Sequence, residues 1–259
     1  METYTTPAIK CGPLEEDIMH APHALIAGTT GSGKSVLLRR CLLYAANQDY
    51  KTMLIDPKDR ELVQWKDAVN TWGYAHRPQE IVALLHECIL MMESRLASMK
   101  GWERDYAGDP VWIIIDEWSD ICDNAPEAAK LVKMLAQKGR AAGMHVLLCT
   151  QHPSAEIING SIKANFPVRC ALHVANGTYS RMIIERKGAE LLPYRGYAML
   201  MHESGDVELY ETKDLPLEEE KRVCEYMISC NPRLNPVPAS SAPEKKKGFF
   251  GRIFAGREK

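Results

Sequence analysis

The sequence predicts an α/β fold in which a mostly parallel sheet is covered by helices on both faces. Short apolar runs typical of buried strands alternate with longer segments whose apolar residues recur at helical spacing. Several of the apolar runs end in polar or glycine-rich segments. Because ligands bind at the carboxyl ends of the strands in open parallel sheets, we expect the functional residues in these segments.

The first predicted strand-loop-helix unit lies near the front of the chain. The apolar run from His23 to Ala27 predicts a buried strand, and the apolar spacing from Lys34 to Ala46 predicts a helix. A second short strand is expected over Thr52 to Ile55, and it ends in Asp56-Pro57-Lys58. Pro78 opens a helix whose apolar side chains keep helical spacing to Leu96, so this helix should pack on the sheet.

The middle of the chain continues the alternation. Val111 to Ile115 is a continuous apolar run, as expected of a strand covered on both faces, and it ends in Asp116-Glu117. A helix is expected from about Pro126 to Ala142, stopping at Gly143. Strands should follow over His145 to Cys149, ending at Thr150-Gln151, and over Val168 to Val174.

The last third predicts a β-hairpin and a closing helix. Tyr197 to Met201 and Val207 to Tyr210 flank a turn, and Leu217 to Ile228 has the pattern of a helix. From residue 231 on, proline and serine make a flexible linker into a basic amphipathic tail that begins at Lys245. We therefore expect one folded α/β domain over residues 1–230, followed by a linker and tail over residues 231–259.

Composition narrows the class of protein. The chain has 259 residues, of which 46% are hydrophobic, so it can fill a sizeable core. Eight cysteines occur without a CxxC pair, which favours a reduced compartment, and no apolar run is long enough to span a bilayer. We expect a cytoplasmic protein, with peripheral membrane attachment as an alternative.

Charge is unevenly distributed along the chain. The formal net charge is -2, but residues 244–259 carry a surplus of four positive charges, which leaves the rest at -6. An acidic body does not attract nucleic acid through its overall field, so binding would depend on locally placed basic groups. This argues against a protein that simply coats DNA.

A phosphate-binding loop follows the first strand. The segment GTTGSGKS matches the eight-residue pattern in full, with glycines that let backbone N–H groups converge on a phosphate. Lys34 would contact the β- and γ-phosphates, and the Ser35 hydroxyl would bind Mg²⁺. The predicted ATP-binding residues are Gly28, Thr29, Thr30, Gly31, Ser32, Gly33, Lys34 and Ser35.

Acidic and amide side chains after two later strands would supply the second Mg²⁺ ligand and the water-activating group that the phosphate loop lacks. Asp116 is placed to hold Mg²⁺ through water, and Glu117 to polarise the water that attacks the γ-phosphate. The alternative is that this pair merely caps a strand. Gln151 is expected to hydrogen-bond the γ-phosphate or the attacking water. The pattern favours a hydrolase over a small-molecule kinase.

The chain resembles the motor of FtsK/SpoIIIE-type DNA translocases, of the HerA/FtsK superfamily of P-loop ATPases. The resemblance covers about residues 12 to 212. It is carried in order by the segments 22–35, 54–58, 115–117, 136–143, 150–153 and 162–165, then by Arg169 and by Ser180-Arg181. It implies a RecA-like core, and a ring, usually of six subunits, that pulls double-stranded DNA through its channel using ATP.

In such a ring, the resemblance implies that each nucleotide is completed by an arginine of the neighbouring subunit. Arg169 is the first candidate by its match to the motif, followed by Arg181 and then Arg140. Each is alternatively a surface or structural ion-pair partner. Lys58 is expected either to contact the nucleotide or a neighbour, or to be an exposed turn lysine.

The predicted function is an ATP-dependent ring motor that translocates double-stranded DNA as a homo-hexamer. The alternatives are a related ring ATPase that moves protein, and a nucleotide-dependent adaptor. The hairpin turn over residues 203–206 has no Lys or Arg, so DNA grip is expected instead from loops around residues 123–133 or 154–163. The tail would contact an anionic membrane or a partner protein, or have no role.

Overall fold

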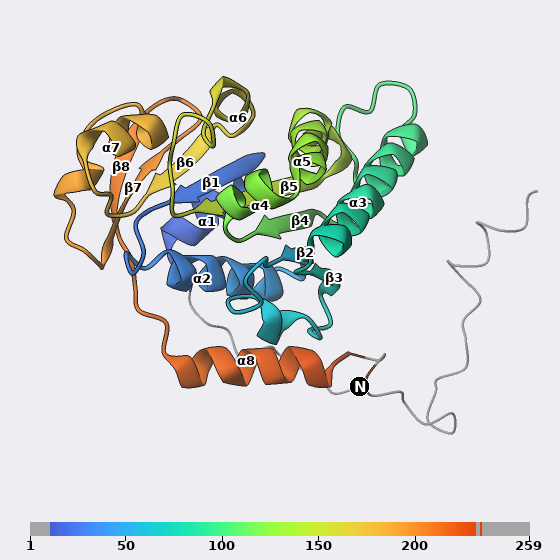
Figure 1. Ribbon diagram of the computed structural model, residues 1–259. Coiled ribbons are helices and arrows are strands. Elements are labelled where there is room, and N and C mark those ends of the chain that lie inside the picture. The colour runs from blue at the N-terminus through green and yellow to red at the C-terminus, as the bar shows by residue number, and fades with distance from the viewer. Residues whose placement is uncertain (1–10, 232–233, 235–259) are drawn as a thin grey trace, which may run out of the picture.

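A computed structural model describes residues 11–231 and residue 234, and these residues fold around one central sheet (Figure 1). The eight strands lie in the order β3-β2-β4-β5-β1-β6-β7-β8. Their bounds are β1 His23–Ala27, β2 Lys51–Ile55, β3 Thr71–Ala75, β4 Val111–Ile115, β5 Met144–Thr150, β6 Val168–Ala171, β7 Tyr197–Met201 and β8 Val207–Glu211.

The sheet is parallel from β3 through β6, and β7 and β8 add an antiparallel hairpin at one edge. Strand β1 lies between β5 and β6, so its carboxyl end opens near the middle of the sheet. The predicted α/β class, the mostly parallel sheet and the C-terminal hairpin are confirmed.

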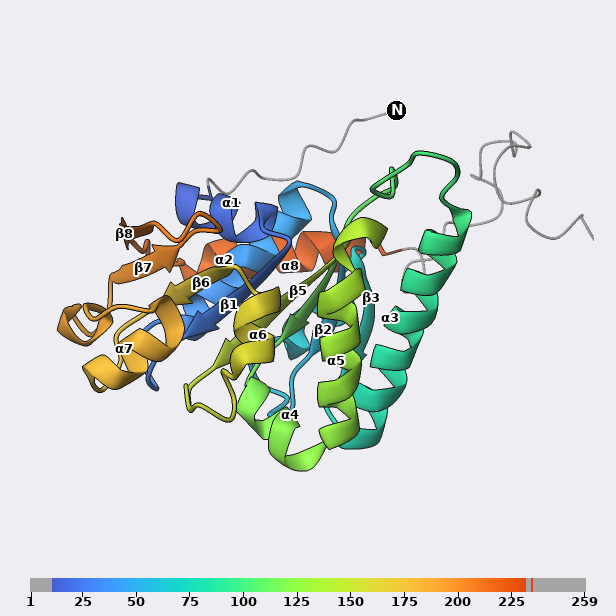
Figure 2. The same ribbon diagram turned by 90° about the horizontal axis from the view of Figure 1, so that it is seen from above.

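Two layers of helices cover the sheet, as Figure 2 shows from above. Helices α1, α2 and α8 pack on one face, and α3, α4, α5, α6 and α7 pack on the other. The helices are α1 Pro13–His20, α2 Lys34–Asn47, α3 Pro78–Ser98, α4 Trp118–Asn124, α5 Pro126–Lys138, α6 Gly160–Asn165, α7 Gly177–Ile184 and α8 Leu217–Ser229. Three short 3₁₀ turns complete the order: η1 Val63–Trp65, η2 Arg140–Ala142 and η3 Ala189–Leu191.

Burial on both faces explains why the central strands are continuous apolar runs. In β1, Leu25 and Ala27 face the core beneath α3 to α7, while Ala24 and Ile26 face the core beneath α1, α2 and α8. Successive strand side chains point to opposite faces, so a strand between two cores has no polar side. The same holds for β4, whose five residues are all buried.

Some boundaries differ from the sequence prediction. Strand β3 was not predicted, because this edge strand exposes Trp72 and has no apolar alternation. The helix expected to reach Ala142 ends at Lys138, where the chain turns tightly through Gly139. There, a Cβ atom would lie 2.5 Å from the Leu135 carbonyl oxygen and 2.6 Å from that of Met144.

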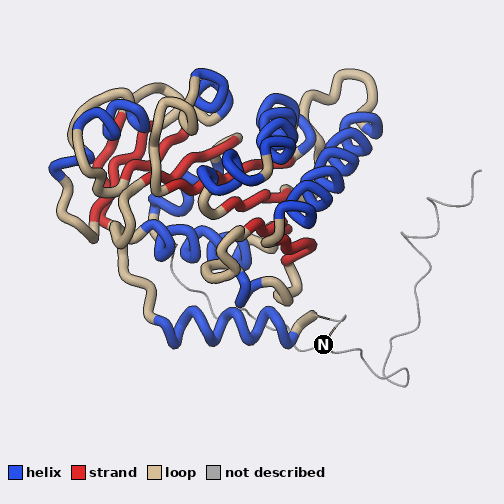
Figure 3. Tube along the Cα trace, viewed as in Figure 1, coloured by secondary structure: helices blue, strands red, loops and turns tan. Residues whose placement is uncertain are grey.

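The last third of the chain contains the remaining strands and the closing helix (Figure 3). Strand β6 ends at Ala171, short of the expected Val174, whereas α8 covers the predicted closing helix. The predicted linker and basic tail lie almost wholly outside the described residues. Within residues 11–231 and 234, no helix combines the length and apolar character that crossing a bilayer requires.

Candidate nucleotide site

The loop between β1 and α2 wraps the start of α2. Gly33 has φ 99°, a left-handed conformation that glycine adopts without steric cost, and α2 begins at the next residue. No side chain caps this helix start, so its first N–H groups remain available to an anion. The predicted strand-loop-helix unit is therefore present, with the geometry of a phosphate-binding loop.

Neighbouring strands fix the base of this loop. The Gly28 amide donates to the Thr150 carbonyl at 3.3 Å, and the Thr29 amide donates to the His173 carbonyl at 3.0 Å. The Thr29 hydroxyl donates to the same His173 carbonyl at 3.1 Å. A Cβ atom at Gly28 would lie 2.8 Å from the Leu172 Cβ, so the close approach of the loop to the segment after β6 requires glycine here.

Asp116 lies directly after β4 and is buried. Burial raises the pKa of its carboxyl group to about 6, and nearby Lys34 opposes that rise. Within the described part of the chain, its Oδ1 atom has no hydrogen-bond partner. A buried carboxylate oxygen without a partner, near the lysine of the phosphate loop, fits Mg²⁺, which prefers hard oxygen ligands.

Glu117 is the next residue and is 1% exposed, in a left-handed backbone conformation with φ 50°. Its Oε1 accepts from the Ser119 hydroxyl at 2.7 Å and from the Gln151 amide at 3.0 Å. Its Oε2 accepts from Lys58 Nζ at 3.0 Å. Burial works to raise the pKa of Glu117, but these three hydrogen bonds and the lysine charge outweigh it and hold the pKa below its ordinary value.

The loop after β2 positions Lys58. Asp56 Oδ2 accepts the backbone N–H groups of Arg60, Glu61 and Leu62 at 2.8, 2.8 and 2.9 Å. This turn places the Lys58 ammonium between Glu117 and Asp120, whose Oδ2 lies at 3.6 Å. Lys58 is half-exposed, yet it is an ion-pair partner of the proposed catalytic carboxylate rather than a free turn lysine.

Gln151 connects the phosphate loop to Glu117. Its side-chain Oε1 accepts from the Thr30 hydroxyl at 2.6 Å, while its backbone N–H donates to Glu117. The side chain therefore lies against the loop that would hold the phosphates. This position agrees with the predicted role beside the γ-phosphate, which stays a prediction.

The three candidate arginines are placed very differently. Arg169 in β6 is 3% exposed, and its Nη2 contacts Glu185 Oε1 at 2.7 Å. Its Nη1 donates to the Lys163 carbonyl at 3.3 Å, so the guanidinium is held inside its own subunit. Arg140 and Arg181 are exposed. In this arrangement Arg169 is an ion-pair partner within its own subunit, as in the alternative given for it, and its role at a neighbouring subunit's nucleotide stays a prediction.

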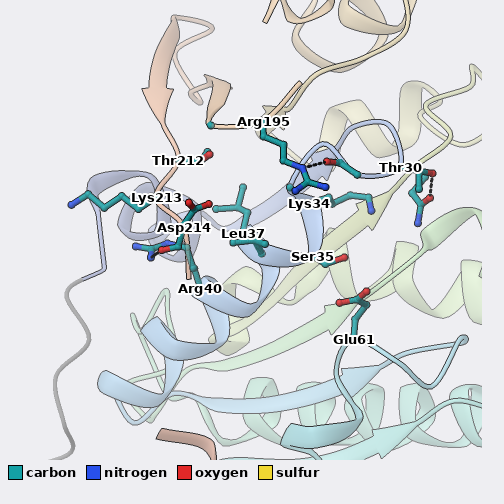
Figure 4. Close-up of a pocket in the computed structure, with 15 residues that line it drawn as sticks. Thr30, Lys34, Ser35, Leu37, Arg40, Glu61, Arg195, Thr212, Lys213 and Asp214 are labelled. Carbon is teal, nitrogen blue, oxygen red and sulfur yellow. Dashed lines mark hydrogen bonds between the residues drawn. The ribbon is translucent and has the colours of Figure 1, made fainter. Parts of the chain in front are cut away.

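The structure adds residues that the sequence patterns did not indicate. A cavity of about 360 Å³ extends from the phosphate loop past Glu61, Arg195 and the segment 212–214 (Figure 4). Arg195 Nε donates to the Gly31 carbonyl at 2.9 Å, and the Tyr194 hydroxyl donates to the Thr30 carbonyl. Residues more than 160 positions away in the chain meet the loop here, and no local sequence signal marks that contact.

Comparison with known sequences agrees with this site. The sequence profile of the FtsK/SpoIIIE family matches residues 7–108. The chain is 33% identical to "DNA translocase FtsK 2" of Neisseria meningitidis, over 71% of this chain and 22% of that protein. It is 35% identical to "DNA translocase FtsK" of Lactiplantibacillus plantarum, over 70% of this chain and 26% of that protein. The chain thus spans about a quarter of the length of these relatives.

Solved structures share the fold. The cytoplasmic domain of the Type VII secretion ATPase EccC of Thermomonospora curvata superposes with a TM-score of 0.71 at 20% identity, over 82% of this chain and 28% of that one. The pCW3 conjugation coupling protein TcpA, solved with ATPγS, gives a TM-score of 0.68 at 24% identity, over 81% of this chain and 66% of that one. With its phosphate loop, buried carboxylates and sheet order, the chain belongs to the FtsK/SpoIIIE family and has a P-loop ATPase fold.

Proposed function

We propose that this chain hydrolyses ATP and uses the energy to translocate double-stranded DNA. The observation that carries the proposal is the convergence of Lys34, Asp116, Glu117 and Gln151 at the carboxyl edge of the sheet. A nucleotide-binding adaptor needs the loop but has no use for a buried, ionised carboxylate beside it. Similarity to proteins named DNA translocase FtsK supports duplex DNA as the substrate.

In this proposal, different residues bind the phosphates, hold Mg²⁺ and activate the attacking water. The loop amides and Lys34 bind the β- and γ-phosphates, and Ser35 and Asp116 would hold Mg²⁺, which neutralises charge on the phosphate oxygens. Glu117 accepts a proton from the attacking water, because its carboxylate is kept ionised by the hydrogen bonds already described. Gln151, tied to Thr30, orients that water or the γ-phosphate.

Assembly as a homo-hexameric ring is part of the proposal. A ring lets an arginine from one subunit stabilise the charge that develops on the γ-phosphate in the next. Because Arg169 is buried in its own subunit, we assign this role to an exposed arginine, Arg181 on α7 before Arg140. DNA would be gripped by loops other than the hairpin, and the exposed Lys130 and Lys133 of α5 lie within the stretch expected for it.

The proposal is tested by the steady-state ATPase rate with and without linear duplex DNA. We expect duplex to stimulate the rate, and we expect Lys34→Ala and Glu117→Gln each to lower it by about 10²- to 10⁴-fold. Glu117→Gln should still bind ATP, whereas Lys34→Ala should bind it poorly. Lys221→Ala, an exposed change on α8, is the control and should retain the wild-type rate. A rate indifferent to duplex would contradict the proposal.

A further inference from the structure

The cavity at the phosphate loop is larger than the phosphates require. Its loop end consists of Thr30, Gly31, Gly33, Lys34 and Ser35, and it then continues along α2 past Val36 and Leu37. The rest of its lining is a hairpin wall made by residues 195–196 and 212–214, which no motif in the sequence assigns to a ligand. Figure 4 shows Arg195 over the loop end and Thr212, Lys213 and Asp214 farther along.

The hairpin wall is built by the two ends of the β7–β8 hairpin. Tyr197 pairs with Glu211, and the Thr212 amide donates to the Gly196 carbonyl at 2.8 Å, so residues 195–196 and 212–214 leave the sheet side by side. The Asp214 carbonyl accepts from Arg40 Nη1 at 3.5 Å. The wall is thereby anchored to α2, the helix that begins at the phosphate loop.

A second set of contacts ties the segment 192–196 to the loop itself. The Tyr194 hydroxyl and Arg195 Nε donate to consecutive loop carbonyls, those of Thr30 and Gly31. His173, whose carbonyl holds Thr29, also binds the Leu192 carbonyl through Nδ1 at 2.8 Å. The guanidinium of Arg195 is therefore fixed through Nε. Its two Nη nitrogens have no hydrogen-bond acceptor among the residues that the structure describes.

We propose that residues 195–196 and 212–214, with Val36, form the subsite for the nucleoside of the bound nucleotide, and that Arg195 is its main affinity determinant. This inference rests on the proposed function, because it takes ATP as the ligand of the phosphate loop. The loop amides, Lys34 and Ser35 already supply the donors that the β- and γ-phosphates need, so the remainder of the cavity is left for base and ribose.

The chemistry of the wall suits a nucleoside. A guanidinium is planar and weakly hydrated, so it stacks on the face of an aromatic ring, and one tethered through Nε loses little entropy when it does so. The half-buried Val36 supplies apolar contact, while Thr212 and Asp214 supply polar groups for base edges and ribose hydroxyls. If Arg195 served only to bind the phosphates, the apolar and polar side chains along the rest of the wall would have no role.

Calorimetric titration with Mg-ATP and with Mg-tripolyphosphate, which has no nucleoside, tests the assignment. We expect Arg195→Ala to weaken ATP binding about tenfold and to leave tripolyphosphate binding unchanged. Arg195→Lys, which keeps the charge but loses the planar group, should show the same selective loss. Arg186→Ala, an exposed arginine whose Nη2 binds the Gly205 carbonyl, is the matched control and should bind both ligands as the wild type does.

Other results of these titrations would overturn one of the two proposals. If the Arg195 variants bind ATP and tripolyphosphate more weakly by the same factor, Arg195 is a phosphate ligand and the assignment is overturned. Unchanged ATP binding in both Arg195 variants would also overturn it. A wild-type protein that binds neither ligand would instead contradict the proposed ATPase itself. Lys34→Ala separates the proposed ATPase site from the nucleoside subsite, because it should weaken the binding of both ligands whether or not the subsite assignment is correct.

Discussion

At Glu117, burial works to raise the pKa of the carboxyl group, and three hydrogen-bond donors outweigh it and keep the carboxylate ionised. Lys58 is the only one of these donors that carries a full charge, and it is half-exposed, so it is also the donor that can most easily leave. Removing one partner of a buried ion pair leaves the other without compensation, which costs more than the pair itself contributes. The pair therefore affects folding as well as catalysis.

We expect Lys58→Met to lower the free energy of unfolding by about 1–2 kcal/mol, between the values for exposed and for buried pairs. Chemical denaturation of wild type, Lys58→Met, Glu117→Gln and the double variant forms a double-mutant cycle. In the Glu117→Gln background, the loss from Lys58→Met should be much smaller, since no charge is left to compensate. Additive losses in the cycle would show that the pair does not couple.

Strands β1 and β5 are linked by a histidine as well as by their backbones. His23 Nδ1 accepts from the Val146 amide at 3.0 Å, and its ring packs against Phe166 with centroids 5.6 Å apart. Burial, with some help from neighbouring His145, lowers the pKa of His23 from 6.5 to about 3. The neutral ring is therefore part of the folded structure over the whole physiological range.

The stability of this strand pair should depend on pH with a definite sign. Between pH 6.5 and about 3, the unfolded chain binds a proton at His23 that the folded chain does not, so the free energy of unfolding falls as the pH falls. Urea denaturation at pH 7.5 and pH 5.5 should show a smaller decrease for His23→Asn than for the wild type. His86→Asn, at an exposed histidine, should keep the wild-type decrease.

At the end of α5, the turn into β5 depends on one glycine. Gly139→Ala would place Cβ against two backbone carbonyls, which cannot move as a side chain can, so we expect a loss of about 1–3 kcal/mol in the free energy of unfolding. The matched control is Gly160→Ala at the first position of α6, where nothing lies within 4 Å of a new Cβ. That variant should be neutral or slightly more stable. Equal effects in thermal denaturation would contradict this reading of the turn.

The sequence predicts the elements that are determined by residues close together in the chain. The phosphate loop, the strand ending at Asp116-Glu117 and the hairpin follow from composition and spacing, and all are present. The contacts of Tyr194 and Arg195 with the loop depend on how β7 and β8 join the sheet edge, so spacing does not show them. For the same reason, spacing does not show the burial of Arg169 against Glu185, which depends on how β6 lies beside the end of α7.

At the scale of the whole molecule, the buried position of Arg169 affects how a ring would complete each nucleotide site. Arg181 on α7 is exposed, whereas Arg169 in the sheet is buried and paired with Glu185 of its own subunit. Sharing one catalytic site between two subunits is what would make hydrolysis in one depend on its neighbour. This dependence can be tested without a structure of the assembly.

Mixing two inactive variants tests the shared site. Lys34→Ala lacks nucleotide binding, and Arg181→Ala lacks the arginine proposed to complete the neighbour's nucleotide site, so each alone should have little ATPase activity. In mixed rings, an intact phosphate loop on one subunit can meet an intact Arg181 on the next, and part of the duplex-stimulated rate should return. An Arg181→Ala protein with the wild-type rate would exclude this arginine, and Arg140→Ala would then be measured in the same way.

Movement along duplex DNA is measured most directly by displacement of a third strand, a short oligonucleotide bound as a triplex on a linear duplex, upon addition of ATP. We predict that the wild-type chain displaces the third strand with ATP and Mg²⁺, and that it does not when EDTA is present or when Glu117→Gln replaces the wild type. Rapid ATP hydrolysis on duplex with the third strand left in place would contradict translocation.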